Sequence, residues 1–361
     1  MPFCRSKCSY CDFYSFNADD SIIDNYTSVL EEHITLSGKR LGRPADTLYF
    51  GGGTPSLLGG ERIARLVNAA KRAFRLENAE ITVEVNPADD LYCDFEAIKS
   101  SGVNRISLGI QSANEQELAA LSRRHSVNNV VRTIYDAKAA GIDNISVDLM
   151  LGIPHQTIKS LEDSLKFALS LGVNHISCYI LKLEQGTPLY NISQSGNSAL
   201  SLPDDETVAE MYLFMSDFLE SRGFSHYEIS NFALEGKQSK HNLKYWNCDE
   251  YLGLGPSAHS FINDKRFYFK RDLNKYLGDP EIVNDGDGGS SDEYIMLRLR
   301  LKEGIEFSKY ESRYTQSIGD RFLKKAENFS RMGLGILDDR HFSLTQKGFL
   351  LSNSVIAELL E

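Results

Sequence analysis

The sequence lacks the features that place a protein in a membrane or on nucleic acid. No apolar run approaches the roughly 18 to 20 residues that would span a bilayer, and charged Arg5, Lys7 and Asp12 interrupt any signal-peptide core at the N-terminus. Basic residues are outnumbered, 39 against 50 acidic ones, and the formal charge of −11 argues against a general nucleic-acid binder. With 42% apolar residues in 361, the composition is that of a globular protein, which we expect in the cytoplasm.

Cysteine is scarce, with six residues, yet half of them fall within the first dozen positions. Cys4, Cys8 and Cys11 have the spacing C-x3-C-x2-C. Cytoplasmic thiols stay reduced, so such a cluster indicates a metal-binding or catalytic site rather than disulfides. The remaining three are scattered singly, and we interpret them as small buried hydrophobic residues, most clearly the second: Cys93, Cys178 and Cys248.

Short apolar runs alternate with helical patterns over the first 200 residues. The runs cover residues 46–53, 81–87, 105–112, 144–154 and 175–183. Residues 61–74 and 161–172 between them have the 3.6-residue periodicity of helices. This alternation predicts βα units around a parallel sheet, with the chemistry at the carboxyl ends of the strands.

After about residue 200 the alternation stops. A helical pattern over 203–223 is followed by an aromatic strand-like stretch, 265–271, and by the polar, glycine-rich 284–293, which indicates a linker or long loop. The ending, two helical patterns and then a strand, a turn and a terminal helix, resembles a winged helix. Given the acidity, we interpret it as a packing or partner domain. We therefore expect three regions: 1–200, 201–283 and 284–361.

Three thiolates leave a metal centre incomplete. A structural zinc site would need a fourth protein ligand, but position 13 is Phe13. Iron–sulfur clusters are usually held by four cysteines, so three leave one iron open to a small molecule with an amine and a carboxylate. Arg5 and Lys7 favour the thiolate form, and we expect Tyr10 and Phe13 to pack against the centre. A chance cluster of thiols or a partial zinc knuckle is the alternative.

The cysteine spacing, with an aromatic residue between the second and third cysteines, resembles the signature of the radical S-adenosylmethionine (SAM) superfamily. The resemblance implies a [4Fe–4S] cluster on Cys4, Cys8 and Cys11. In that family SAM binds the unique iron through its amino and carboxylate groups, and an electron from the cluster cleaves it to a 5′-deoxyadenosyl radical. The family fold is a partial TIM barrel, here (β/α)6-like, with the winged-helix-like α+β region at the C-terminus.

Segments at the predicted strand ends also resemble SAM-binding motifs of this superfamily, namely FGGGTP, TVEVNP, GIQSAN, LSRRH and VDLMLGIP. The resemblance implies these SAM contacts: Gly51, Gly52, Gly53, Thr54, Glu84, Gln111, Arg123 and Asp148. Arg123 could pair with the SAM carboxylate, Glu84 could accept from its amine, and Asp148 could accept from the ribose hydroxyls. The alternatives are a surface arginine, next to Arg124, and solvated carboxylates at the barrel rim.

Nearly the whole chain resembles the coproporphyrinogen III oxidase-like branch, including PFCRSKCSYCDFYS, LMLGIPHQT and SLTQKG. The dehydrogenases of that branch have a further cysteine at the position of Phe13, whereas the haem chaperone subgroup, HemW, has phenylalanine. HNLKYW (241–246) also matches the H-N-x-x-Y-W haem motif of this subgroup.

The motif supplies the candidate haem-binding residues His241, Asn242, Tyr245 and Trp246. Haem iron takes an axial imidazole, and planar aromatic groups pack on a porphyrin. Our hypothesis is that His241 is the axial ligand. His226 and His259 lie in the same region, and a core histidine among ordinary packed aromatics is the alternative reading.

The resemblance therefore implies a haem chaperone that carries a [4Fe–4S] cluster, SAM and haem. Its partner would be a haem acceptor of the respiratory chain or a haem store, with no nucleic acid and no transmembrane segment, and with peripheral membrane contact left open. The enzyme alternative is oxygen-independent coproporphyrinogen III dehydrogenase, which decarboxylates two propionates to vinyls; a third is a degenerate barrel acting only as an interaction module. Family members usually begin with a strand of the type YIHIPFC, so we expect most of the first strand to be absent here, with an unpaired edge beside the cluster.

Overall fold

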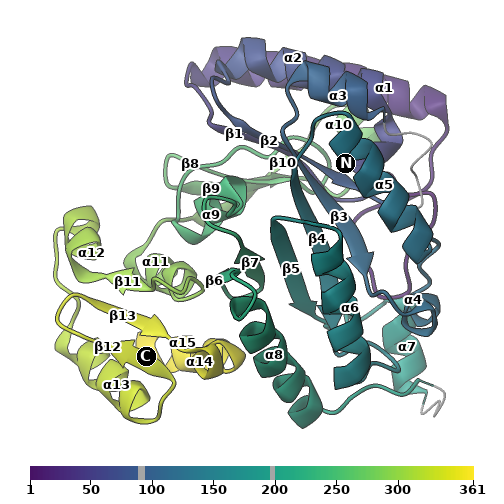
Figure 1. The fold of residues 1–361 in the computed structure, drawn as a ribbon. Helices are drawn as coiled ribbons and strands as arrows, with labels where there is room; N and C mark the ends of the chain where they lie inside the picture. Colours follow the sequence, from purple (N-terminus) through teal and green to yellow (C-terminus); the bar gives the residue numbers. More distant parts are fainter. Residues whose placement is uncertain (88–93, 196–199) are drawn as a thin grey trace. The chain divides into compact units, whose positions relative to one another are not determined.

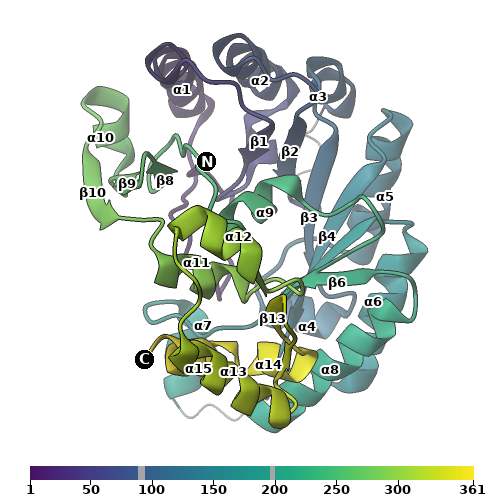
Figure 2. The same cartoon turned by 90° about the vertical axis from the view of Figure 1, so that its left-hand side faces the viewer.

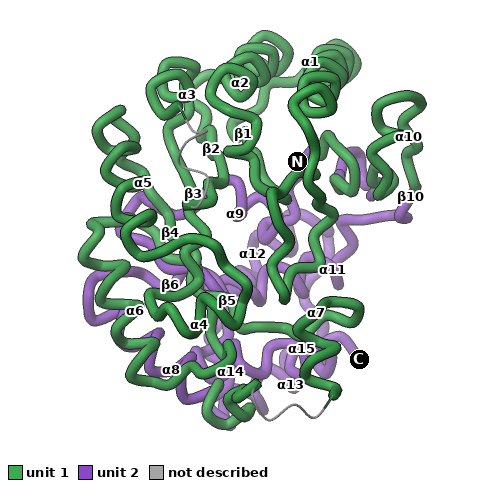
Figure 3. Tube along the Cα trace, turned by 90° about the vertical axis from the view of Figure 1, so that its right-hand side faces the viewer, with its two compact units in different colours: residues 1–208, 253–259, 267–284 green, residues 209–252, 260–266, 285–361 purple. Residues whose placement is uncertain are grey.

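The computed structural model describes residues 1–87, 94–195 and 200–361 and divides them into two compact units (Figure 3). Unit 1 contains residues 1–208, 253–259 and 267–284, and unit 2 contains residues 209–252, 260–266 and 285–361. Residues of the predicted accessory region 201–283 therefore occur in both units. That this region has a function of its own stays a prediction. The interpretation of Cys93 as buried lies outside the described residues.

Unit 1 contains five parallel strands that neighbour one another in chain order (Figure 1). They are β1 (Thr47–Phe50), β2 (Glu80–Val85), β3 (Arg105–Gln111), β4 (Asn144–Leu151) and β5 (His175–Ile180). Each falls within one of the five apolar runs or begins one residue before it. The parallel sheet predicted from the alternation is confirmed, and so is the partial TIM barrel that the family resemblance implied.

Helices connect these strands, and α2, α3, α5 and α6 line the outer face of the sheet (Figures 1 and 2). The helical elements of unit 1 are α1 (Asp20–Leu41), the 3-10 turn η1 (Pro55–Leu58), α2 (Gly60–Phe74), α3 (Phe95–Ser101), α4 (Glu115–Ala120), α5 (Val127–Ala139), α6 (Ile158–Ser170), α7 (Pro188–Gln194) and α10 (Leu273–Gly278). Both helices expected from periodicity, at 61–74 and 161–172, are present as α2 and α6.

Alternation along the strands separates an apolar face from a polar one. The side chains on the helix-covered face are buried: Ile81, Val83, Val85, Ile106, Leu108, Ile110, Ile145, Val147, Leu149, Ile176 and Cys178. Because strand side chains alternate with a period of two, the intervening residues point to the inside of the barrel. Cys178 is 1% exposed, as expected of a small core residue.

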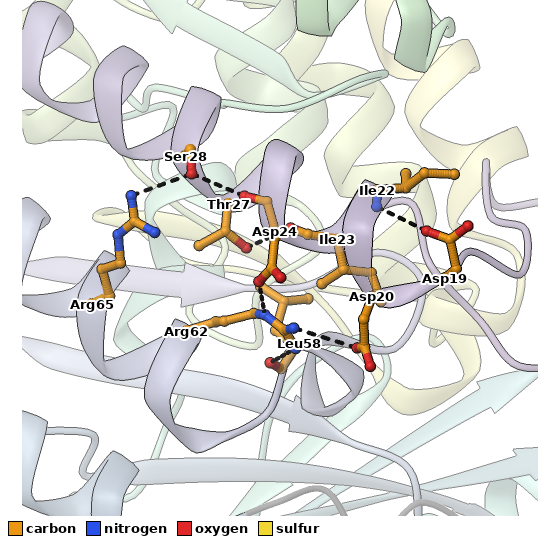
Figure 4. Close-up of polar contacts among 10 residues, drawn as sticks. All are labelled: Asp19, Asp20, Ile22, Ile23, Asp24, Thr27, Ser28, Leu58, Arg62 and Arg65. Carbon is orange, nitrogen blue, oxygen red and sulfur yellow. Dashed lines mark hydrogen bonds and ion pairs between the residues drawn. The ribbon is translucent and has the colours of Figure 1, made fainter.

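An ion-pair cluster joins α1 to α2 at the start of the barrel (Figure 4). Arg62 of α2 donates to Asp24 at 2.6 Å, to Asp20 at 3.3 Å and to the Leu58 carbonyl at 3.0 Å. Asp19 caps α1 by accepting from the Ile22 amide. Exposed ion pairs of this kind contribute little to the stability of a fold. Their main effect here is to hold α1, which follows the cysteine segment, in place against α2.

Unit 2 contains a hairpin, an antiparallel sheet and the remaining helices. Its elements are β6 (Ser225–Glu228), β7 (Asn231–Ala233), α9 (Lys240–Trp246), α11 (Ser291–Arg298), β11 (Ile305–Glu306), α12 (Phe307–Tyr314), α13 (Asp320–Arg331), β12 (Gly335–Leu337), β13 (His341–Leu344), α14 (Gln346–Leu350) and α15 (Ser352–Leu360). β6 and β7 pair antiparallel. The order β11-β13-β12, all antiparallel, with α13 beside β12, agrees with the predicted winged-helix-like ending.

Four elements contain residues of both units: α8 (Asp205–Glu220), β8 (His259–Ile262), β9 (Lys265–Phe269) and β10 (Ile282–Asp287). The three strands form a sheet in the order β10-β9-β8. β9 confirms the strand expected at 265–271, and α8 confirms the helix expected at 203–223.

The interpretation of residues 284–293 as a linker or long loop is wrong. β10 runs through to Asp287, and α11 begins at Ser291. An ion pair between Lys265 and Asp287 and a hydrogen bond from the Gly288 amide to Asp264 hold the stretch to the hairpin. Exposed edge strands carry polar and charged residues, so the polar composition of this stretch is that of an edge strand rather than of a loop.

Candidate metal centre and ligand site

The three N-terminal cysteines lie together on a loop closed by its own backbone. The Cys4 amide donates to the Phe16 carbonyl at 3.0 Å, and the Cys11 amide donates to the Cys8 carbonyl at 3.2 Å. All three thiols are free and half-buried. Burial raises the pKa of Cys11, against a hydrogen bond from the Phe13 backbone, and the neighbouring Cys8 and Cys4 raise this pKa further.

Hydrogen bonds fix this loop to two helices of unit 1. At the end of α4, the Leu121 carbonyl accepts from the Ser9 amide and the Ala120 carbonyl accepts from the Ser9 hydroxyl. The Ser9 carbonyl accepts from the Leu189 amide in α7 at 2.9 Å. Tyr10 packs against the apolar cluster that includes the buried Leu121 and Leu189. That its ring also packs against the metal centre stays a prediction.

The expectation for Phe13 is wrong. Its side chain is 64% exposed, so it does not pack against the thiols. The chain reverses just before it, at the Cys8–Cys11 turn, and Lys7 donates its ammonium to the Phe13 carbonyl at 3.0 Å. Spacing alone placed Phe13 beside the cysteines, but the turn directs its ring to solvent.

The glycine motif after β1 approaches the start of the chain closely. The Gly53 amide donates to the Met1 carbonyl and the Thr54 amide to the Phe3 carbonyl, both at 2.7 Å. A Cβ on Gly53 would lie 2.5 Å from the Phe3 oxygen, so no larger residue fits there. Thr54 also places its hydroxyl 3.3 Å from the sulfur of Cys4. The glycine motif and the cysteine loop therefore form one site.

Glu84 of β2 faces this site from the barrel interior. Its carboxylate accepts from the Tyr49 hydroxyl at 2.8 Å and from the Gly52 amide at 3.1 Å. Burial raises its pKa to about 7, against the opposing effect of the Tyr49 hydrogen bond. Glu84 is therefore a fixed, half-buried acceptor and not a solvated rim carboxylate.

Arg123 connects the cysteine loop to two strand ends. Its guanidinium donates to the Gly109 carbonyl at 2.5 Å and to the Asn86 side chain at 3.3 Å, and it lies 3.6 Å from the sulfur of Cys8. Its Nε is buried without a hydrogen-bond partner, whereas the neighbouring Arg124 is exposed. The surface-arginine alternative is therefore wrong for Arg123, and a ligand acceptor could satisfy the remaining donor.

Gln111 and Asp148 complete the polar edge. Gln111 ends β3 after a register shift and has a positive φ of 61°. Its side-chain nitrogen lies so near Gly109 that a Cβ there would be only 2.9 Å from it. Asp148 accepts from the Ser107 hydroxyl at 3.2 Å. Burial raises the pKa of Asp148, against hydrogen bonds from Ser177 and Ser107 and the charge of Arg105. Asp148 too is held by partners inside the barrel rather than solvated at its rim.

One residue of this site was missed by sequence reasoning. Tyr49 donates to Glu84 and holds it in place. It could have been found by counting two positions back from Gly51, because residues two apart on a strand face the same side. Asn86, which follows β2, was expected among the polar residues at the strand ends, and it accepts from Arg123.

Within residues 1–87, 94–195 and 200–361, no three His, Cys, Asp or Glu side chains are arranged to hold one metal ion.

The second candidate site is the helix α9 in unit 2. Ser239 caps it, accepting from the Asn242 amide at 3.3 Å. His241 Nε2 lies 2.9 Å from the hydroxyl of Tyr245, one turn later, and the ring of Tyr245 meets that of Tyr251 edge to face. No residue of α9 is buried, so the core-histidine alternative is wrong for His241.

Trp246 and the other two histidines differ from His241 in their surroundings. The indole Nε1 of Trp246 is buried without a partner. His226 is 1% exposed, with its ring nitrogens near Ser216 and Tyr212, so it cannot reach a ligand without unfolding its surroundings. His259 is exposed and stacked on Tyr268.

Comparisons with known proteins agree with this geometry. Residues 1–168 match the Radical SAM superfamily, and residues 292–351 match the HemN C-terminal domain. The chain is 34% identical over 375 residues to "Heme chaperone HemW" of Bacillus subtilis, covering 100% of this chain and 97% of that protein. The chain belongs to the HemW family of radical SAM proteins.

Other HemW-like proteins match over similar lengths. "Heme chaperone HemW" of Mycobacterium tuberculosis is 32% identical, covering 100% of this chain and 93% of its own. "Radical S-adenosyl methionine domain-containing protein 1, mitochondrial" of Bos taurus is 33% identical, covering 99% and 86%. Coproporphyrinogen III oxidase (HemN) of Escherichia coli shares the fold, with a TM-score of 0.83 at 22% identity, covering 99% of this chain and 88% of that one.

Membership in the radical SAM superfamily implies a [4Fe–4S] cluster and SAM. In the part of the chain that the structure describes, no helix is both long and apolar enough to cross a membrane.

Proposed function

We propose that this protein is a cytoplasmic haem chaperone, which holds a [4Fe–4S] cluster and SAM in its barrel, binds haem and transfers it to an acceptor protein. The observation that carries the proposal is the full-length similarity to proteins named heme chaperone HemW. The acceptor would be a haem protein of the respiratory chain or a haem store.

The cysteine loop supports the assignment of the cluster to Cys4, Cys8 and Cys11. Its three free thiols lie on one loop, with the sulfur of Cys4 3.3 Å from the Thr54 hydroxyl and the sulfur of Cys8 3.6 Å from the Arg123 guanidinium. When bound, the cluster would supply one-electron chemistry at an iron open to SAM.

The residues around the loop fit SAM. Its carboxylate would meet the unpartnered Nε of Arg123, and its amine would meet Glu84, which already accepts from Tyr49 and Gly52. Asp148 would accept from the ribose hydroxyls. The remaining contacts would come from Gln111, whose amide flanks Gly109, and from the backbone of the glycine motif: Gly51, Gly52, Gly53 and Thr54.

The helix α9 supports the haem assignment. His241, Asn242, Tyr245 and Trp246 lie on a short helix in which no residue is fully buried, and Tyr245 is 36% exposed. His241 would exchange its hydrogen bond with the Tyr245 hydroxyl for the iron, and a ligand acceptor could satisfy the buried indole N–H of Trp246.

The enzyme alternative is coproporphyrinogen III dehydrogenase. Phe13 stands where that subgroup has a further cysteine, and the likeness to HemN extends to the fold alone. The interaction-module alternative gives no reason for three free thiols next to a glycine motif that tolerates no Cβ.

The test is a reconstitution under anaerobic conditions. We expect about four irons per chain, a Soret band on addition of haem, appearance of that haem in apomyoglobin, and no conversion of coproporphyrinogen III. The control is the variant with Cys4, Cys8 and Cys11 all changed to Ala, which should lose the cluster. Conversion to protoporphyrinogen, or absence of haem binding by the reconstituted protein, would overturn the proposal.

A further inference from the structure

A pocket of about 580 Å³ in unit 2 is lined by the end of α9 and by residues of α11 and α12. None of its residues belongs to the cluster, SAM or haem sites proposed above. The lining residues are Asn247, Asp249, Tyr294, Arg298, Glu303, Ser308, Lys309, Ser312 and Arg313. Guanidinium, ammonium, amide and hydroxyl groups outnumber the two carboxylates among them, so the lining is rich in hydrogen-bond donors. A pocket of this volume holds a small ligand or part of a larger one, and its donors suit an anion.

Arg298 of α11 is the buried cation of this pocket, with 8% of its side chain exposed. It donates to the Gly304 carbonyl at 2.9 Å, to the Asn247 side-chain oxygen and to Glu303 at 3.2 Å. A guanidinium has five N–H donors, so these bonds leave two without a partner among the described residues. The Glu303 side chain is 79% exposed, and an ion pair with so exposed a carboxylate is weak. A ligand anion could therefore still pair with Arg298.

Arg313 of α12 brings a second guanidinium to the same pocket. It donates to the Asn247 carbonyl at 3.4 Å and to the Cys248 carbonyl at 2.8 Å. Its guanidinium carbon lies 5.2 Å from the ring centre of Tyr294 and 5.9 Å from that of Tyr314. Carbonyls and aromatic rings hold a guanidinium in one direction, but they do not neutralise its charge. An anion next to Arg313 would supply the missing countercharge.

The pocket begins where the candidate haem helix ends. Asn247 is the C-cap of α9 and stands six positions after His241. At 1.5 Å per residue, this separation is about 9 Å along the helix axis. Haem carries its two propionates on one edge of the ring, at a distance from the iron that is comparable with this length. A haem bound to His241 and lying along α9 could therefore direct its propionates to the pocket.

We propose that this pocket binds a propionate of the haem, with Arg298 and Arg313 as the groups that recognise it. The choice of haem rests on the proposed function. The two remaining donors of Arg298 would bind the carboxylate, and Arg313 would add its charge. The alternative is that the two arginines only fasten the end of α9 through Asn247, and the experiment separates these two roles.

The experiment compares haem with haem dimethyl ester, which has the same ring and no free carboxylate. Reconstituted protein is titrated with each, and the ratio of the two affinities is the quantity of interest. We expect wild type to bind the ester about tenfold more weakly, because charge-assisted hydrogen bonds are lost. Arg313→Met should weaken haem binding by a similar factor and leave ester binding unchanged, so that the ratio approaches one. Arg313→Lys should have an intermediate ratio, because it keeps the charge without the planar donors.

Two further variants keep the result interpretable. Arg298→Lys retains the charge of the buried position and should also lower the ratio, whereas the exposed position of Arg313 makes its variants the safer ones for folding. Arg331→Met, at an exposed arginine on α13 that pairs with Glu327, is the matched control and should have the wild-type ratio. The Soret maximum should stay the same in all these variants, since the proposed axial ligand is untouched.

The outcomes are distinct. Equal affinity of wild type for haem and its ester would overturn the inference, and so would a wild-type ratio in Arg313→Met, which would place the propionates elsewhere. An equal loss of haem and ester binding in Arg313→Met would assign the arginine to fastening α9 and would overturn the inference as well. The proposed function stands in all three cases. Absence of haem binding in wild type would instead overturn the proposed function.

Discussion

Arg271 and Asp12 stand 259 positions apart and form an ion pair of 3.5 Å next to the third cysteine. The same guanidinium donates to the Asp12 carbonyl at 2.5 Å and lies 5.7 Å from the ring centre of Tyr14. The Leu273 amide adds a hydrogen bond to the Tyr14 hydroxyl at 2.9 Å. All four residues belong to unit 1, so the segment before α10 fastens the end of the cysteine loop.

We expect Arg271→Ala to lose its cluster several times faster than wild type when an iron chelator is added. An isolated exposed ion pair contributes little to stability, so the thermal unfolding temperature should change by only a few degrees. The measurement is the decay of the cluster absorbance under anaerobic conditions. Arg132→Ala, which breaks an exposed pair with Asp136 on α5, serves as the matched control. Equal decay in the two variants would show that Arg271 does not hold the loop.

Replacing Arg123 with Lys should weaken SAM binding by about tenfold or more. A lysine keeps the charge but cannot donate at once to Gly109, to Asn86 and to a ligand carboxylate, as the planar guanidinium can. The measurement is a SAM titration of the reconstituted protein. The exposed neighbour offers the control, because Arg124→Lys should titrate as wild type. Unaltered affinity in Arg123→Lys would remove Arg123 from the SAM site.

We expect the contribution of Glu228 to the free energy of unfolding of unit 2 to fall as the pH rises from about 4.5 to about 8. Burial raises the pKa of Glu228 from 4.5 to about 8, against hydrogen bonds from Ser230 and Asn231 and the charge of Arg300. Between these values the folded protein binds more protons than the unfolded chain, so the free energy of unfolding decreases with rising pH.

Glu228→Gln removes this titration. We expect its free energy of unfolding to exceed that of wild type at pH 8 and the difference to shrink toward pH 5, measured by denaturant unfolding of the apoprotein. The nearby His226, whose pKa burial lowers to about 4, titrates in both proteins and so cancels in the difference. Glu235→Gln, at an exposed position, should parallel wild type. A constant offset between wild type and Glu228→Gln would contradict the prediction.

The haem-bound spectrum should depend on His241. We expect His241→Ala to shift the Soret band and to weaken haem binding, since the imidazole is the proposed axial ligand. Tyr245→Phe should bind haem at least as tightly as wild type, because the competing hydrogen bond to Nε2 is removed. The control is His259→Ala, at the exposed histidine stacked on Tyr268. An unchanged spectrum in His241→Ala would exclude His241 as the ligand.

The strands of the barrel could be predicted because each carries a strong local pattern. Arg105 to Gln111 alternate between buried aliphatic residues and polar ones, and the same holds for Asn144 to Leu151. The cysteine spacing and the glycine motif are equally local. The residues at the strand ends then come together because parallel strands end at one edge of the sheet.

What could not be predicted depends on contacts between distant parts of the chain or on the direction of a turn. Arg271 pairs with Asp12 across 259 positions, and nothing in either segment indicates the partner. Phe13 faces solvent because of the turn at Cys8–Cys11. The polar residues 284–287 belong to a strand because β10 pairs with β9 at the edge of a three-stranded sheet, and the segment itself does not indicate that partner.

Because no residue of α9 is buried, haem binding at this helix, as proposed, would be separate from the stability of the fold. Seven residues held by the Ser239 cap and by edge contacts such as Tyr245 with Tyr251 contribute little to the core. Substitutions in HNLKYW should therefore change how tightly haem is held and how fast it leaves without endangering the fold. A carrier needs this independence, because its affinity must match that of each acceptor and not the requirements of folding.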